Sequence, residues 1–219
     1  MLILDIANII LLIPIALLSV SFHEYMHGRV SHMLGDPTPE AMGRLTMNPL
    51  AHLDIFGTLA IILIHVGWAK PVPVNPRYYK NPRKGLMYVG MAGPAANIVL
   101  ALGFVVLFRL LAMYYGVSSS HLLYYSLRGM LSSKPLTMIS TMIFMGININ
   151  LALAIFNLIP VPPLDGSKIL RGFLPSSIDK YLYKLEGPIG MLVVIALVYL
   201  GFVDKIIFPL VTIIQSYLL

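Results

Sequence analysis

The chain has 219 residues, of which 58% are hydrophobic and 11% charged, whereas soluble globular domains carry roughly 25% charged residues. So few charges cannot cover a water-exposed surface, so we expect an integral membrane protein. The net charge of +6 could indicate a nucleic-acid partner, but the basic residues lie between apolar stretches, so membrane orientation explains them better. The absence of cysteine excludes disulfides and thiolate zinc sites.

Four apolar stretches approach or exceed the length of about 20 residues that a transmembrane helix needs. They cover residues 2–27, 85–114, 135–159 and 188–219. The last stretch contains Asp204 and Lys205 near its middle, where we expect a break. The sequence therefore predicts an all-α polytopic membrane protein with about four to six transmembrane helices, forming one membrane-embedded domain over residues 1–219.

The first stretch ends in the motif His23-Glu-Tyr-Met-His27. Because residues four apart share one face of a helix, the two imidazoles can bind the same metal ion. Neutral imidazole suits zinc, and Glu24 lies close enough to accept a proton from water that the metal activates. A polar helix interface is the simpler interpretation, but an intramembrane glutamate is costly unless it faces a cavity or a partner. We therefore predict one zinc ion per chain.

A shorter apolar stretch, residues 55–68, is too short for a full span, so we expect a re-entrant segment there. Lys and Arg collect on the cytoplasmic side of short membrane loops. Most of the basic residues lie in the regions 28–84 and 165–187. We therefore predict a multi-pass protein of the cell membrane whose motif-bearing side faces the cytoplasm.

Two histidines do not complete a catalytic zinc site, which usually has three protein ligands and one open position. Among the remaining acids, Asp165 is the best candidate, because it follows the third apolar span in the segment Phe156-Asn-Leu-Ile-Pro-Val-Pro-Pro-Leu-Asp-Gly166. The predicted helix order brings this segment back to the membrane depth of the histidines. Taken alone, Asp165 could equally be a helix N-cap after a proline turn.

These elements together resemble the site-2 protease family of intramembrane zinc metalloproteases, peptidase family M50. The resemblance covers the His-Glu-x-x-His helix, the element Asn157-x-x-Pro-x-Pro-x-Leu-Asp-Gly166, and Gly93-Pro-Ala-Ala-Asn97 at the start of the second long helix. It implies that His23, His27 and Asp165 bind zinc, that Glu24 is the general base, and that Asn157 binds the substrate backbone or the oxyanion. Gly93, Pro94 and Asn97 are expected to form scaffold, with Asn97 close to the site.

The resemblance also implies a function: regulated hydrolysis of a peptide bond within or near a transmembrane segment of a membrane protein. The expected partners are that substrate and the lipid bilayer, with no nucleic acid. A regulatory membrane protein or a second copy of the chain are further candidates. Some family members carry soluble domains, and this chain is expected to be a compact form without a PDZ or CBS domain.

Two alternatives stay open at this point. Prenylated-protein peptidases also use a two-histidine helix but take a glutamate as third ligand, for which Glu40 and Glu186 are the candidates here. A zinc-binding membrane scaffold or a transporter would need no general base at all. A transporter would be expected to carry polar residues along several helices, whereas here they gather at one level. Replacing Glu24 distinguishes the other two possibilities, because an enzyme would lose turnover and keep its metal, while a scaffold would be unaffected.

Overall fold

The structure, a computed structural model, describes residues 6–64, 67–128, 131, 134–175 and 187–219, which contain helices and turns but no strand. The elements are α1 (Ile6–Met33), α2 (Thr38–Ala41), α3 (Pro49–His52), α4 (Ile55–Ile64), η1 (Pro76–Tyr78), α5 (Pro82–Tyr114), α6 (Ser119–Leu127), α7 (Lys134–Asn157), α8 (Asp165–Phe173), α10 (Pro188–Tyr199), η2 (Val203–Ile207) and α11 (Phe208–Leu218). The prediction of an all-α protein is confirmed.

Three helices are long and apolar enough to cross a membrane: α1 over residues 10–33, α5, and α7 from residue 135. The pair formed by α10 and residues 203–218 meets the same criterion only as one broken span, bent by 61°. The described residues therefore supply three spans, or four if the broken pair counts as one, and four is the lower end of the predicted range. The bend lies beside Asp204 and Lys205, where the sequence predicted a break.

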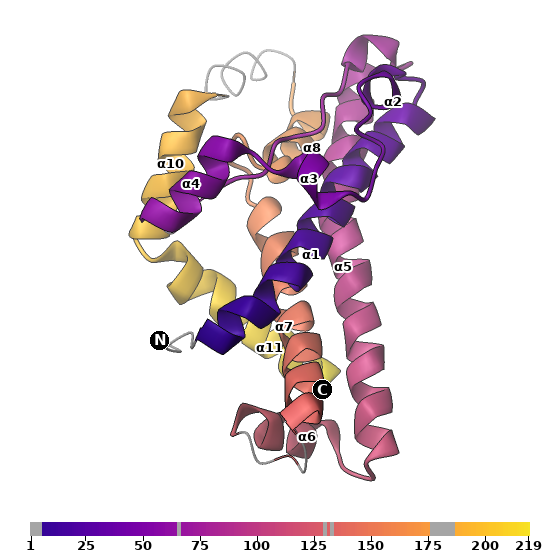
Figure 1. Ribbon diagram of the computed structural model, residues 1–219. Helices are drawn as coiled ribbons and strands as arrows, with labels where there is room; N and C mark the ends of the chain where they lie inside the picture. The colour runs from indigo at the N-terminus through magenta and orange to yellow at the C-terminus, as the bar shows by residue number, and fades with distance from the viewer. Residues whose placement is uncertain (1–5, 65–66, 129–130, 132–133, 176–186) are drawn as a thin grey trace.

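The longest helix, α5, runs the full height of the molecule and packs against α1, α7 and α8 (Figure 1). Its second half joins α6, α7 and α11 in one apolar core, which contains the fully buried side chains Phe108, Leu122 and Ile147. Other large apolar side chains of α5 face outward, among them Val106, which is 55% exposed. A long apolar surface of this kind is suited to contact with lipid rather than water.

The segment between α3 and α5 leaves the helix bundle as α4 and returns to its starting point. Lys70 N donates to His52 O at 2.9 Å, which joins the two ends of the excursion. Gly57 of α4 lies so close to the returning backbone that a Cβ there would be 2.0 Å from Trp68 O. The predicted re-entrant segment thus has the closed path that re-entry needs, while its depth in a bilayer stays a prediction.

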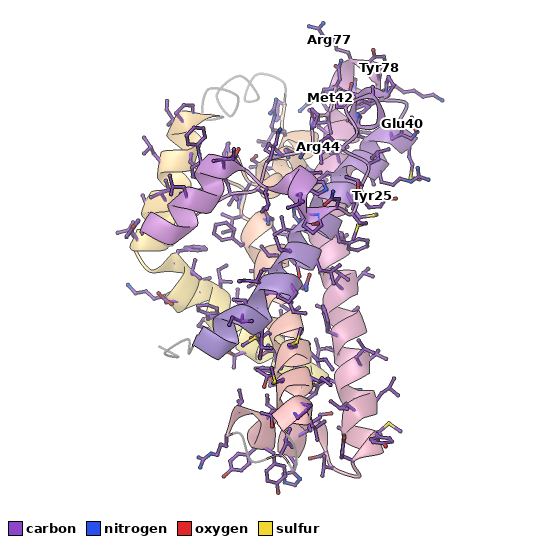
Figure 2. The ribbon with its side chains drawn as sticks, viewed as in Figure 1. Tyr25, Glu40, Met42, Arg44, Arg77 and Tyr78 are labelled. Carbon is purple, nitrogen blue, oxygen red and sulfur yellow. The ribbon has the colours of Figure 1, made fainter. Side chains whose placement is uncertain are left out.

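The connection after α1 is held by a buried carboxylate. Asp36 accepts hydrogen bonds from Ser31 Oγ at 2.7 Å, Asn75 N at 2.7 Å and Thr38 N at 2.9 Å. Burial alone would raise the pKa of Asp36, but these hydrogen bonds lower it below its usual value. The exposed residues Met42 and Tyr78 lie on these loops, at the end of the molecule where α1 finishes (Figure 2).

Candidate metal centre

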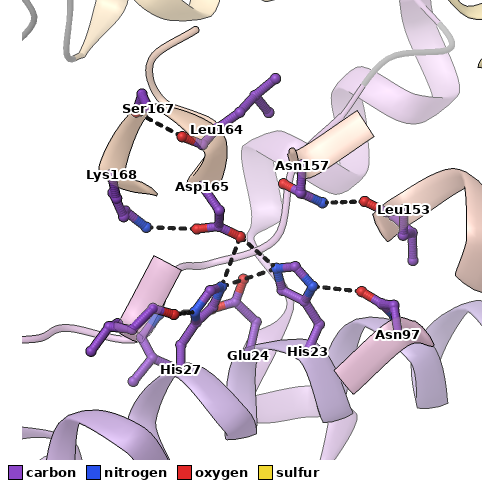
Figure 3. A network of polar contacts seen from close by, with 12 residues as sticks. His23, Glu24, His27, Asn97, Leu153, Asn157, Leu164, Asp165, Ser167 and Lys168 are labelled. Carbon is purple, nitrogen blue, oxygen red and sulfur yellow. Dashed lines mark hydrogen bonds and ion pairs between the residues drawn. The ribbon is translucent and has the colours of Figure 1, made fainter. Parts of the chain in front are cut away.

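The three residues predicted to bind a metal meet between α1 and α8. His23 Nε2 and His27 Nε2 are 3.0 Å apart, and Asp165 Oδ2 lies 3.1 Å from the first and 3.0 Å from the second. All three residues are buried, with 7%, 5% and 4% of their surface exposed. They form a compact group of possible metal ligands (Figure 3).

The second nitrogen of each imidazole has its own partner on α5. His23 Nδ1 lies 2.6 Å from Asn97 Oδ1, and His27 Nδ1 lies 2.7 Å from the carbonyl oxygen of Val89. A carbonyl oxygen can only accept, so each Nδ1 carries the ring proton and each Nε2 presents a lone pair. This arrangement is typical of histidines that bind a metal, because the outer hydrogen bond fixes both the tautomer and the ring orientation.

Asp165 is the first residue of α8, but its side chain does not cap the helix. The N-cap position belongs to Leu164, which makes no side-chain capping bond. Instead, Asp165 Oδ1 accepts from Lys168 Nζ at 2.9 Å, while Oδ2 faces the two imidazoles and has no hydrogen-bond partner among the described residues. The carboxylate is thus oriented by Lys168 on one oxygen and directed at the histidines with the other.

The chemistry of this donor set fits a zinc ion. With both rings neutral and protonated on Nδ1, as zinc binding requires, the two Nε2 atoms and Asp165 Oδ2 are three acceptors that face one another. Such a group is repulsive unless a cation joins it, and imidazole nitrogen and carboxylate oxygen are common zinc ligands. Gly93 of α5 lets the two imidazoles approach that helix closely, because a Cβ at this position would lie 2.5 Å from both Nε2 atoms.

Glu24 lies beside the two imidazoles and is held by a backbone amide (Figure 3). Its Oε2 accepts from Val72 N at 3.0 Å, which ties α1 to the segment that returns from α4. Since this hydrogen bond uses one oxygen, the other remains available for proton transfer. Glu24 is 9% exposed and borders a cavity of about 480 Å³ that the metal-ligand candidates, Trp68 and Asn157 also line.

A polar network extends from the site into the bundle. Asn97 Nδ2 donates to Asn150 Oδ1 at 2.8 Å, and Asn150 Nδ2 donates to Ser19 Oγ at 2.9 Å. All three residues are completely buried, and they come from α5, α7 and α1. The network therefore fixes the relative positions of the three helices at the level of His23.

Two further polar side chains line the cavity. Asn157 Nδ2 donates to Leu153 O of its own helix at 3.0 Å, so its carbonyl oxygen and second N–H remain available. Ser21 is 1% exposed, and its hydroxyl has no hydrogen-bond partner among the described residues. Both can therefore hydrogen-bond to a molecule that enters the cavity.

The structure brings His23, Glu24, His27 and Asp165 together, as the sequence analysis expected, with Asn157 on the rim of the same cavity. Glu40 is exposed and pairs with His32 at 3.7 Å, away from the metal-ligand candidates, while Glu186 lies outside the described residues. Sequence reasoning missed Lys168, whose spacing of three from Asp165 on a helix was the available signal. It also missed the Val72 amide and the Val89 carbonyl, which no side-chain pattern reveals.

Comparison with known proteins gives concordant results. The sequence model of peptidase family M50 matches residues 10–201. The "Putative zinc metalloprotease YwhC" of Bacillus subtilis is 37% identical over 172 residues, which is 78% of this chain and 72% of the relative. A protein of Mycolicibacterium smegmatis with the same description, Rip2, is 27% identical over 92% of this chain and 71% of its own length. No solved structure matches the chain.

Proposed function

The chain belongs to peptidase family M50 and is a membrane-embedded zinc metalloprotease, and from this premise we propose that it hydrolyses a peptide bond within or near a transmembrane segment of a membrane protein. One observation carries the proposal: the metal-ligand candidates and Glu24 line a buried cavity between apolar helices. A peptide that reaches this cavity comes most directly from the lipid, as part of a neighbouring membrane protein.

In this proposal His23, His27 and Asp165 hold the zinc ion, and Glu24 is the general base. Bound zinc supplies Lewis-acid activation of water and of the scissile carbonyl. Glu24 accepts a proton as the water oxygen bonds to the carbonyl carbon, and it delivers that proton to the amide nitrogen as the C–N bond breaks. The products are a carboxylic acid and an amine, so one water molecule accounts for all atoms.

The cavity also offers groups that can hold the substrate backbone. The Asn157 amide can donate to the developing oxyanion or accept from a peptide N–H, and the free Ser21 hydroxyl can do either. A helical peptide group is already hydrogen-bonded and poorly exposed to attack. Substrates must therefore unwind locally, and we expect cleavage beside helix-weakening residues such as Gly and Pro.

The basic residues support a cytoplasmic location of the site. Arg83 Nη2 at the start of α5 donates to Arg171 O of α8 at 3.1 Å, so the two basic loop regions meet at one end of the bundle. This is the end at which α1 finishes and the metal-ligand candidates lie. By the positive-inside rule that end faces the cytoplasm.

The proposal is tested with the purified wild type, Glu24→Gln and Asp165→Ala in detergent, measuring zinc content beside cleavage of a transmembrane peptide. We expect near one zinc per chain in the wild type and Glu24→Gln, cleavage only in the wild type, and weakened zinc binding in Asp165→Ala. Glu40→Gln is the matched control, since Glu40 is exposed and distant from the cavity. Unchanged cleavage by Glu24→Gln would contradict the mechanism and leave a zinc-binding scaffold as the better description.

A further inference from the structure

A second cavity adjoins the cavity that the metal-ligand candidates line, and we take the two together as one groove because they share part of their walls. The second cavity has a volume of about 560 Å³ and shares Gly67, Leu153 and Phe156 with the first. From there it extends along α7 to Ile149 and is closed on its other side by residues around the α10–α11 bend. Continuity with the catalytic cavity makes the substrate chain the natural occupant of this groove.

The lining of the second cavity is apolar with one exception, Asp204. The other residues are Gly67, Ile149, Ala152, Leu153, Phe156, Val198, Val203 and Ile207. Asp204 lies on the π-helical turn η2, directly after the 61° bend. This turn opens the second half of the broken span, and it brings a carboxylate to the wall of an apolar cavity.

The Asp204 carboxylate has no partner among the described residues: no hydrogen bond or ion pair there involves it. The neighbouring Lys205 does not neutralise it, since Lys205 Nζ lies 3.4 Å from Leu200 O, at the end of α10. Asp204 lies near the middle of the broken span Pro188–Leu218. An ionisable side chain at such a position is costly without a partner and is usually functional.

We propose that Asp204 is a subsite that binds a basic side chain, Lys or Arg, in the transmembrane segment of the substrate. This inference rests on the proposed function, because it takes the substrate chain as the occupant of the groove. Charge complementarity selects the side chain: the second cavity offers apolar contact and one negative charge, the Asp204 carboxylate. Asp204 is exposed, so a cation that reaches the groove can form an ion pair with it, which leucine cannot do.

Helix geometry gives the register. From Phe156 to Ile149 the groove follows α7 for two turns, or about 11 Å. An extended peptide covers about 3.3 Å per residue, so one that follows α7 from the level of Phe156 to that of Ile149 uses about three to four residues, and we expect the basic residue at about this distance from the scissile bond or further. A substrate that stays helical beyond that bond would place it about seven positions away, at 1.5 Å per residue.

The experiment uses transmembrane peptides with one Lys moved stepwise from the second to the eighth position on the membrane side of the scissile bond, beside an all-Leu parent. We expect one position to raise kcat/KM at least tenfold over the parent. In Asp204→Asn this Lys-to-Leu ratio should fall to about one, whereas in the matched control Lys205→Gln it should persist. Zinc content checks that each variant has folded.

Peptide binding to Glu24→Gln and to the double variant Glu24→Gln/Asp204→Asn separates this inference from the protease proposal. A Lys preference in binding that Asp204→Asn abolishes supports the subsite even if the wild type cleaves none of the peptides, which would contradict only the protease proposal. The subsite is overturned if kcat/KM does not depend on the position of the Lys, or if the Lys preference persists in Asp204→Asn. Either result leaves the protease proposal intact.

Discussion

Helices α5 and α7 take part in two regions of opposite character. Where α5 and α7 meet α6 and α11, Phe108 and Ile147 pack in an apolar core. At the level of the metal-ligand candidates, α1, α5 and α7 are joined by Ser19, Asn97 and Asn150 through directed hydrogen bonds. Apolar packing is non-directional and tolerates repacking, whereas an unmade buried hydrogen bond is costly. The apolar core therefore stabilises the packing of the helices, and the polar layer fixes the positions of the site residues.

The largest effect on the zinc site is expected from Gly93→Ala. The added methyl would lie 2.5 Å from both Nε2 atoms, so the imidazoles must move and zinc affinity should fall by about 100-fold or more. Gly103→Ala, on the same helix, is the control, because a Cβ there meets nothing within 4 Å. Zinc titration against a chelator measures both, and equal affinities would contradict the close packing described at Gly93.

Asn97→Ala should have the next largest effect. It removes the acceptor for His23 Nδ1 and leaves Asn150 Oδ1 without its donor. Losing such an outer hydrogen bond typically costs about 10–100-fold in metal affinity or activity. Asn148→Ala provides the comparison, since the Asn148 side chain donates to Phe144 O of its own helix and to no other described residue. Zinc affinity and peptide cleavage should both separate the two variants. Similar losses in both would show that the effect is general destabilisation.

A smaller effect is expected from Lys168→Met. Lys168 orients Asp165 through an ion pair at 2.9 Å, but its side chain is 31% exposed, so solvent weakens the interaction. Zinc affinity should fall about threefold to tenfold, at or below the usual range for residues that orient a metal ligand. Lys168→Arg keeps the positive charge and should restore most of the affinity. Failure of arginine to restore it would indicate that Lys168 acts by packing rather than by charge.

No effect on the zinc site is expected from a change in the apolar core. Phe108→Ala removes a fully buried ring and should destabilise the fold by about 3 kcal/mol. Thermal unfolding should show a lower Tm, while zinc affinity and kcat per folded molecule stay at the wild-type values. A large loss of zinc affinity in this variant would mean that the two regions are coupled.

The sequence was most informative where function restricts residue type. The spacing of His23 and His27 on one helix, and the position of Asp165 after an apolar span, were sufficient to expect these residues close together. The long helices could be predicted equally well, because a stretch of about 20 apolar residues is typical of a transmembrane helix and rare elsewhere. Asp204 was visible only as a break in the last span.

What could not be read from the sequence depends on tertiary contacts. The Val72 amide binds Glu24 and the Val89 carbonyl binds His27, but every residue has an amide or a carbonyl, so no pattern marks these two. Asn150 is one of several asparagines in the apolar stretches, and only the packing of α7 against α1 and α5 shows that it belongs to the site.

The candidate metal ligands come from distant parts of the sequence and are therefore synthesised at different times. His23 and His27 leave the ribosome with α1, whereas Asp165 follows only with α8, after α5 and α7 have been made. On the proposed mechanism, a nascent chain therefore enters the membrane with an incomplete set of ligands and stays inert until its last quarter emerges. A chain that stops after α7 lacks Asp165 and should therefore neither hold zinc firmly nor cleave a peptide.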